Sequence, residues 1–115
     1  MAKAYEYPAV TEDLLDDVVG RIVAAGHPDR ILLFGSRARG DAAADSDLDL
    51  LVIEETDVPR RRRAARYREA LRGLFPSKDI VVWTAAEADE WSNVPQAFVT
   101  TALREGRLLY ERGEG

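Results

Sequence analysis

Residues 31–53 read ILLFGSRARGDAAADSDLDLLVI, and this stretch decides the fold. Its first four residues form a short continuous apolar run, which is typical of a strand covered on both faces. Residues 48–53 predict a second strong strand, and the turn-like residues 40–46 come before it. The loop from Gly35 to Asp47 is too short to hold a full crossover helix, so the two strands are predicted to be antiparallel.

The sequence on either side alternates helices with further strands. We expect, in chain order, a helix capped by Thr11 and ended by Gly26, a helix from about 58 to 74, a strand at 79–83, a helix from about 95 to 106 and a strand at 108–110. The second helix should bury Ala64, Tyr67, Leu71 and Leu74 and turn most of its arginines to water. This order predicts an α/β fold, with a small mixed sheet of three to four strands and flanking helices.

Composition narrows the class of protein. The 115 residues suffice for one core, so a single domain spanning 1–115 is expected. The chain has no cysteine, which excludes disulfides, thiolate metal sites and cysteine nucleophiles. No apolar run approaches the roughly 20 residues of a membrane span, and residues 1–10 lack the apolar stretch of a secretory signal. We therefore expect a cytoplasmic protein.

Charge is unevenly distributed along the chain. The net charge is −5, yet residues 60–72 hold seven arginines and a single acid, Glu69. One interpretation is a solvated helix surface; another is a contact with an acidic partner or with RNA phosphates. The acidic remainder of the chain offers no basic track, so direct binding of nucleic acid is not expected.

Gly35 and Ser36 follow the first strand directly. A glycine lets the backbone approach a ligand, and free N–H groups at the start of a helical turn suit an anion. The Ser36 hydroxyl adds a donor, and Arg37 is either a further phosphate contact or merely solvated. The pair predicts a phosphate-binding loop, although turn-forming residues of this kind also occur in plain polar loops.

Two carboxylates stand across the loop from this glycine. Asp47 and Asp49 are two residues apart at the start of a strand, so their side chains point to the same side, about 7 Å apart at Cα. Such a pair is costly unless a cation neutralises it, and hard oxygen ligands favour Mg²⁺ or Mn²⁺. Asp79 begins the next strand and completes a three-carboxylate site if the two strands are neighbours. Together with the loop, these acids predict a metal-dependent phosphoryl transfer.

The motif Phe34-Gly35-Ser36, followed after ten residues by Asp47-Leu48-Asp49, resembles the signature of the DNA polymerase β-like nucleotidyltransferase superfamily. The string GSRARGDAAADSDLDLLV is most similar to its minimal nucleotidyltransferases, and the likeness extends over about residues 10–112. The resemblance implies that Gly35 and Ser36 bind the phosphates of ATP, and that Asp47, Asp49 and Asp79 hold Mg²⁺ and act in catalysis.

The resemblance also implies a partner. Minimal nucleotidyltransferases are often antitoxins of HEPN ribonuclease toxins, and some transfer AMP to a tyrosine of the toxin. The sequence shows no second region to hold an acceptor, so we expect a hetero-oligomer with such a toxin. The alternatives are a non-catalytic module that neutralises its partner by occlusion, and transfer to the hydroxyl of a small molecule.

Overall fold

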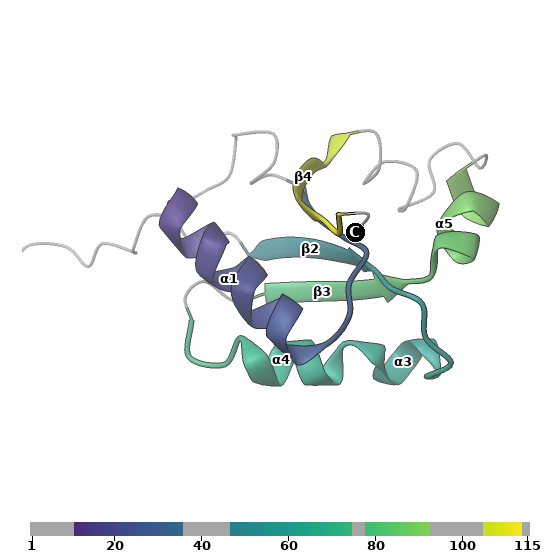
Figure 1. Ribbon diagram of the computed structural model, residues 1–115, viewed down its shortest axis with the longest axis horizontal. Helices are drawn as coiled ribbons and strands as arrows, with labels where there is room; N and C mark the ends of the chain where they lie inside the picture. The colour runs from purple at the N-terminus through teal and green to yellow at the C-terminus, as the bar shows by residue number, and fades with distance from the viewer. Residues whose placement is uncertain (1–10, 36–46, 75–77, 93–104, 114–115) are drawn as a thin grey trace, which may run out of the picture.

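The computed structural model describes residues 11–35, 47–74, 78–92 and 105–113, without the side chains of 91 and 92. Its elements are α1 (Glu12–Ala25), β1 (Arg30–Phe34), β2 (Leu48–Ile53), α3 (Arg60–Arg63), α4 (Ala65–Ala70), β3 (Lys78–Trp83), α5 (Ala85–Ser92) and β4 (Arg107–Glu111) (Figure 1). None of the helices in these ranges is long and apolar enough to cross a membrane.

The first helix begins and ends where the sequence predicts. The Thr11 hydroxyl accepts a hydrogen bond from the Leu14 amide at 3.1 Å, and two acids in the first turn favour the positive end of the helix. At the other end, the Gly26 amide donates to the Ile22 carbonyl at 3.1 Å. The side chains that α1 buries are Leu15, Val18 and Ile22.

The strands form a mixed sheet in the order β3-β2-β1-β4. β1 is antiparallel to β2, as the short loop predicts, and also to β4, whereas β2 and β3 are parallel. The chain can run parallel from β2 to β3 because α3 and α4 form the crossover between them. The predicted α/β class with a small mixed sheet and flanking helices is thus confirmed.

Each face of the sheet has its own core. α1 and α4 cover one face together (Figure 1). Here they enclose Ile31, Leu33, Leu48, Leu50, Val52, Ile80 and Val82 of the sheet. On the other face, Ala88 of α5 packs with Leu32, Leu51 and Ile53. Because side chains alternate along a strand, Asp49 shares this second face with Leu51 and Ile53. The face that α1 and α4 cover is the opposite one.

The prediction of one helix from about 58 to 74 is wrong in two respects. The segment forms two short helices that meet at Ala64, and α4 ends at Ala70, with turns up to Leu74. The break follows four consecutive arginines. The first turn of α3 contains no acidic residue that would favour the positive end of the helix. The predicted buried residues Ala64, Tyr67 and Leu71 are confirmed, and Leu74 is partly buried.

Two further expectations concern the C-terminal third. The helix α5 was not predicted from the sequence, although Thr84 and Glu87 form a capping box, a recognisable signal for a helix start. The helix expected from about 95 to 106 lies almost wholly outside the described residues. The strand expected at 108–110 is confirmed as β4.

Candidate active site

Gly35 ends β1 in a conformation that favours glycine. Its φ angle is +74°, in the left-handed region that other residues rarely adopt. A Cβ atom added here would lie 2.5 Å from Oδ2 of Asp49, well inside van der Waals contact. Both the backbone angle and the space therefore require glycine, and the absent side chain lets the Asp49 carboxylate lie against the backbone of the turn.

Strand register brings the three predicted acids to one end of the sheet. In the parallel pair of β2 and β3, Asp49 is the direct partner of Asp79. In the antiparallel pair, Asp49 lies opposite Phe34, the residue before Gly35. Asp47 precedes β2 and is exposed, as is Asp79, whereas Asp49 is half-buried between them. The sequence predicted a three-carboxylate site only if the strands that carry Asp49 and Asp79 are neighbours, and β2 and β3 are neighbours in the sheet.

The electrostatics of this group favour a bound cation. Burial, and after it the charges of Asp79 and Asp47, raise the pKa of Asp49 above its ordinary value. No ion pair among the described residues involves any of the three carboxylates. Among the described residues, no Lys or Arg forms an ion pair that offsets the repulsion between these acids.

A divalent cation fits this donor set. Within the described ranges, no group of three or more acidic or histidine side chains is placed to hold a metal ion. Mg²⁺ commonly takes only one or two carboxylates and completes its shell with water and substrate phosphates, so the acids at this end of the sheet suit this ion. That Asp47, Asp49 and Asp79 together would hold it stays a prediction from the sequence.

Two predicted phosphate contacts cannot be compared with the structure. Ser36 and Arg37 lie outside the described residues, so their assignment to the nucleotide phosphates stays a prediction. Gly35 is the described member of that loop, and its contact with Asp49 joins the loop to the acids.

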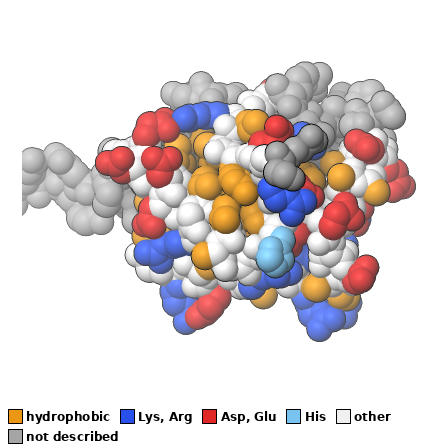
Figure 2. Space-filling model, viewed as in Figure 1, with side chains coloured by type: hydrophobic (Ala, Val, Ile, Leu, Met, Phe, Trp, Pro, Cys, Tyr) orange, Lys and Arg blue, Asp and Glu red, His pale blue; other side chains and the backbone are white. Residues whose placement is uncertain are grey.

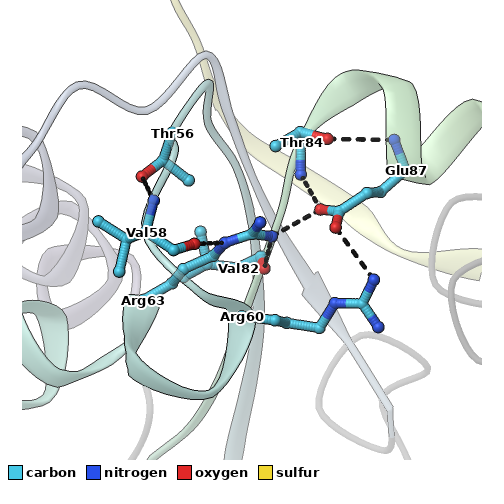
Figure 3. A network of polar contacts seen from close by, with 7 residues as sticks. All are labelled: Thr56, Val58, Arg60, Arg63, Val82, Thr84 and Glu87. Atoms are coloured by element: carbon cyan, nitrogen blue, oxygen red, sulfur yellow. Dashed lines mark hydrogen bonds and ion pairs between the residues drawn. The ribbon is translucent and has the colours of Figure 1, made fainter.

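Arg63 is a buried cation that the sequence analysis treated as one of several solvated arginines. Its guanidinium donates to the Val58 carbonyl at 2.7 Å, to the Val82 carbonyl at 3.3 Å and to Oε1 of Glu87 at 2.6 Å. Arg60 reaches the other Glu87 oxygen at 3.0 Å (Figure 3). This network ties the start of α5 to α3 and to the end of β3.

Glu87 is the centre of that network. Its Oε1 also accepts the Thr84 amide at 2.8 Å, while its own amide donates to the Thr84 hydroxyl. Burial raises its pKa, but the hydrogen bonds from Arg63, Thr84 and Arg60 outweigh this effect and lower the pKa to about 2. Arg60 in addition lies over the ring of Trp83, 4.5 Å from its centroid. The network thus fixes the helix that covers the Asp49 face of the sheet.

Comparison with known proteins agrees with this geometry. The nucleotidyltransferase domain family matches residues 15–109, which is most of the chain. The chain therefore belongs to this family and is a nucleotidyltransferase. It is 31% identical over 87 residues to a protein of Methanocaldococcus jannaschii named "putative protein adenylyltransferase", and the match covers 74% of this chain and 81% of that protein.

Solved structures share the fold. A toxin-antitoxin crystal structure with AMP-PNP is similar with a TM-score of 0.62 and 17% identity, over 85% of this chain and 73% of that one. A mutant of the toxin-antitoxin MntA-HpeT has a TM-score of 0.60 and 14% identity, over 90% of this chain and 75% of that one. At such identities the likeness is one of fold.

Proposed function

We propose that this nucleotidyltransferase transfers AMP from Mg²⁺-bound ATP to a hydroxyl, a tyrosine in our proposal, of a partner HEPN ribonuclease toxin, and so acts as its antitoxin. The observation that carries the chemistry is the direct pairing of Asp49 with Asp79, with Gly35 against the Asp49 carboxylate. In our proposal, the acids at this end of the sheet supply the oxygens that bind the cation, and the turn that begins at Gly35 receives the phosphates.

The transfer exchanges one phosphorus–oxygen bond for another. The acceptor oxygen forms a bond to the α-phosphorus of ATP, while the bond from that phosphorus to the bridging oxygen of the β-phosphate breaks. Pyrophosphate leaves with the electron pair, and the hydroxyl proton passes to a carboxylate or to water. Asp49 and Asp79, which are partners in the strand register, are the carboxylates that we propose for this role.

Mg²⁺, when bound, would neutralise the carboxylates and the phosphate charge and would make the acceptor hydroxyl more acidic. The chain itself supplies position. Asp47, Asp49 and Asp79 hold the cation side of the site, while Gly35, with Ser36 and Arg37, receives the phosphates. Gly35 ends β1, and Asp49 lies in the neighbouring strand β2. We therefore expect the α-phosphate to bind between the turn at Gly35 and the acids.

The comparisons support the acceptor class. The relative from Methanocaldococcus jannaschii is named for transfer of adenylyl groups to protein, and two structures of similar fold are toxin-antitoxin complexes, one of them with an ATP analogue. Together with the site, these names favour a protein as the acceptor and ATP as the donor.

The test is label transfer from α-labelled ATP, with Mg²⁺, to the partner toxin of this proposal. We expect labelled toxin with the wild-type chain, no label with Asp47→Asn/Asp49→Asn, and loss of label when the acceptor tyrosine becomes phenylalanine. Absence of label from the wild type, under conditions where ATP binds, would refute transfer to that protein. If the double variant protects cells from the toxin as well as the wild type does, occlusion rather than catalysis is the mechanism.

A further inference from the structure

A basic pocket of about 270 Å³ lies between the end of α4 and the start of β3. It is lined by Arg68, Leu71, Arg72, Gly73, Leu74 and Lys78. Three of these six residues are cations, and the two leucines give the pocket an apolar floor. Gly73 contributes open space, because a Cβ added there would meet no atom within 4 Å.

The cations around this basic pocket exceed the acids. No carboxylate of the described residues pairs with Arg68, and the pair of Arg72 with Glu69 is largely exposed on both sides. An exposed pair of this kind contributes about 0–1 kcal/mol, so an incoming anion readily replaces it. Arg21, which is paired with Asp17 at 3.2 Å, also lies at this end of α4 and donates to the Ala70 carbonyl at 3.3 Å. This local excess stands in a chain of net charge −5.

The basic pocket is separate from the candidate active site. Lys78 and Asp79 are consecutive in β3, so their side chains leave the sheet on opposite faces. Lys78 lies on the face covered by α1 and α4, where its ammonium donates to the Leu74 carbonyl. An anion in the pocket would therefore sit behind the sheet from the three carboxylates, at the same end of β3.

We propose that the basic pocket is a second anion site that binds a phosphoryl group. Two arginines and a lysine line the pocket, and arginine and lysine are the side chains that proteins use to bind phosphoryl groups. The volume is below the roughly 300–1,000 Å³ typical of sites for drug-sized ligands, so the site takes a group smaller than a whole nucleotide. None of the described residues that line the pocket is aromatic.

Basic side chains gather in two groups along the lower margin of Figure 2, one over α4 and one over α3. This division supplies a matched control, because Arg61 and Arg62 are exposed on α3 and form no ion pair with a described residue. Arg68→Gln/Arg72→Gln and Arg61→Gln/Arg62→Gln remove the same charge from the same stretch. Only the first pair removes it from the basic pocket.

The experiment is an NMR titration of the ¹⁵N-labelled full chain at constant ionic strength without Mg²⁺. The probes are inorganic phosphate, pyrophosphate and AMP. We expect saturable shifts at the amides of residues 68–73 and Lys78, weakened about tenfold or more by Arg68→Gln/Arg72→Gln and within twofold of wild type for the control pair. Tighter binding of phosphate or pyrophosphate than of AMP would assign the site to free oxyanions, and the reverse order to nucleotide phosphates.

Two results would overturn the proposal. One is an equal loss of affinity in both double variants, which indicates diffuse attraction to the arginines. The other is a set of saturable shifts confined to Gly35 and its neighbours, which places every bound phosphate in the candidate active site. Circular dichroism of both variants checks that they are folded. The titration needs no partner and no turnover, so its result is independent of the proposed transfer reaction.

Discussion

Gly35 combines a positive φ angle with a close approach to a carboxylate, and the two effects can be separated by mutation. Gly35→Ala must adopt φ +74° and also place a Cβ 2.5 Å from Asp49. Gly73→Ala is the matched control, since it meets the same backbone cost at φ +88° with nothing within 4 Å. We expect Gly73→Ala to lose about 1 kcal/mol of unfolding free energy and to keep its activity. Gly35→Ala should lose more stability and nearly all nucleotide transfer.

Urea unfolding and label transfer measure these two effects. Equal losses of stability and of activity in the two variants would show that the contact with Asp49 has no role.

Asp49 illustrates a conflict between stability and function. Its raised pKa means that the ionised carboxylate costs more free energy in the folded chain than in the unfolded chain. Asp49→Asn removes that charge, so the metal-free variant should melt at a temperature at or above that of the wild type. Transfer should fall by more than about 100-fold, because the variant loses the metal contact that we propose for Asp49. Asp57→Asn, an exposed site away from the acids, is the control. A marked decrease of Tm in Asp49→Asn would contradict this account.

At the scale of elements, a buried carboxylate joins α1, β2 and α4. Glu54 follows β2 and is 2% exposed, and its Oε1 accepts the His27 amide at 2.8 Å and the Tyr67 hydroxyl. Arg66 lies 3.5 Å from the other oxygen, which has no hydrogen-bond donor among the described residues. A Cβ at Gly26 would meet both Glu54 and Tyr67, so this helix end is closely packed on the pair.

Tyr67→Phe should therefore destabilise the fold. The substitution leaves Glu54 buried with one donor fewer, which costs about 1–3 kcal/mol. Tyr110→Phe on β4 is the control and should cost less than about 0.5 kcal/mol. Chemical denaturation of both variants measures the difference, and Glu54→Gln/Tyr67→Phe completes a double-mutant cycle. A Tyr67→Phe variant as stable as the control would exclude the proposed role of this hydrogen bond.

The attachment of α5 should depend on pH. Glu87 has an ordinary pKa of 4.5 and a pKa of about 2 in the folded chain. Its contribution, up to about 3 kcal/mol, is complete above pH 4.5 and is lost as the pH falls through about 2. Glu87→Gln should thus be less stable than the wild type at pH 6, and the two should converge near pH 2. Unfolding curves at several pH values measure the gap; a gap independent of pH would contradict the pairing with Arg63 and Arg60.

At the scale of the whole molecule, ligand binding should stabilise the fold. Mg²⁺ with ATP at 100 times its Kd adds about 2.7 kcal/mol to the unfolding free energy. We expect ATP with Mg²⁺ to raise the Tm by several degrees, and ATP with chelator to raise it much less. Asp47→Asn/Asp49→Asn should abolish the difference between the two conditions. An equal rise with and without Mg²⁺ in the wild type would show that the carboxylates do not hold the cation for the nucleotide.

Many of the helices and strands can be predicted from local sequence. The limits of α1 follow from the cap at Thr11 and from Gly26, and the strands follow from apolar runs. Which of the arginines is buried cannot be predicted from local sequence. Arg63 is buried because the Val58 and Val82 carbonyls and Glu87 converge on it, and these groups lie 5 to 24 residues away. No periodicity within residues 60–72 distinguishes it from its neighbours.

The sequence by itself determined the chemistry of the site: a glycine turn after one strand, two acids two residues apart at the start of the next, and a third acid at the start of another. These patterns depend on neighbours in the chain, and the nucleotidyltransferase family follows from them. Only the tertiary structure decided that Asp49 pairs directly with Asp79 and that Asp49 lies against Gly35. It also decided that Lys78 lines a basic pocket on the face of the sheet opposite to these acids. Strand register and the packing of crossover helices set those relations, and both are contacts between residues far apart in sequence.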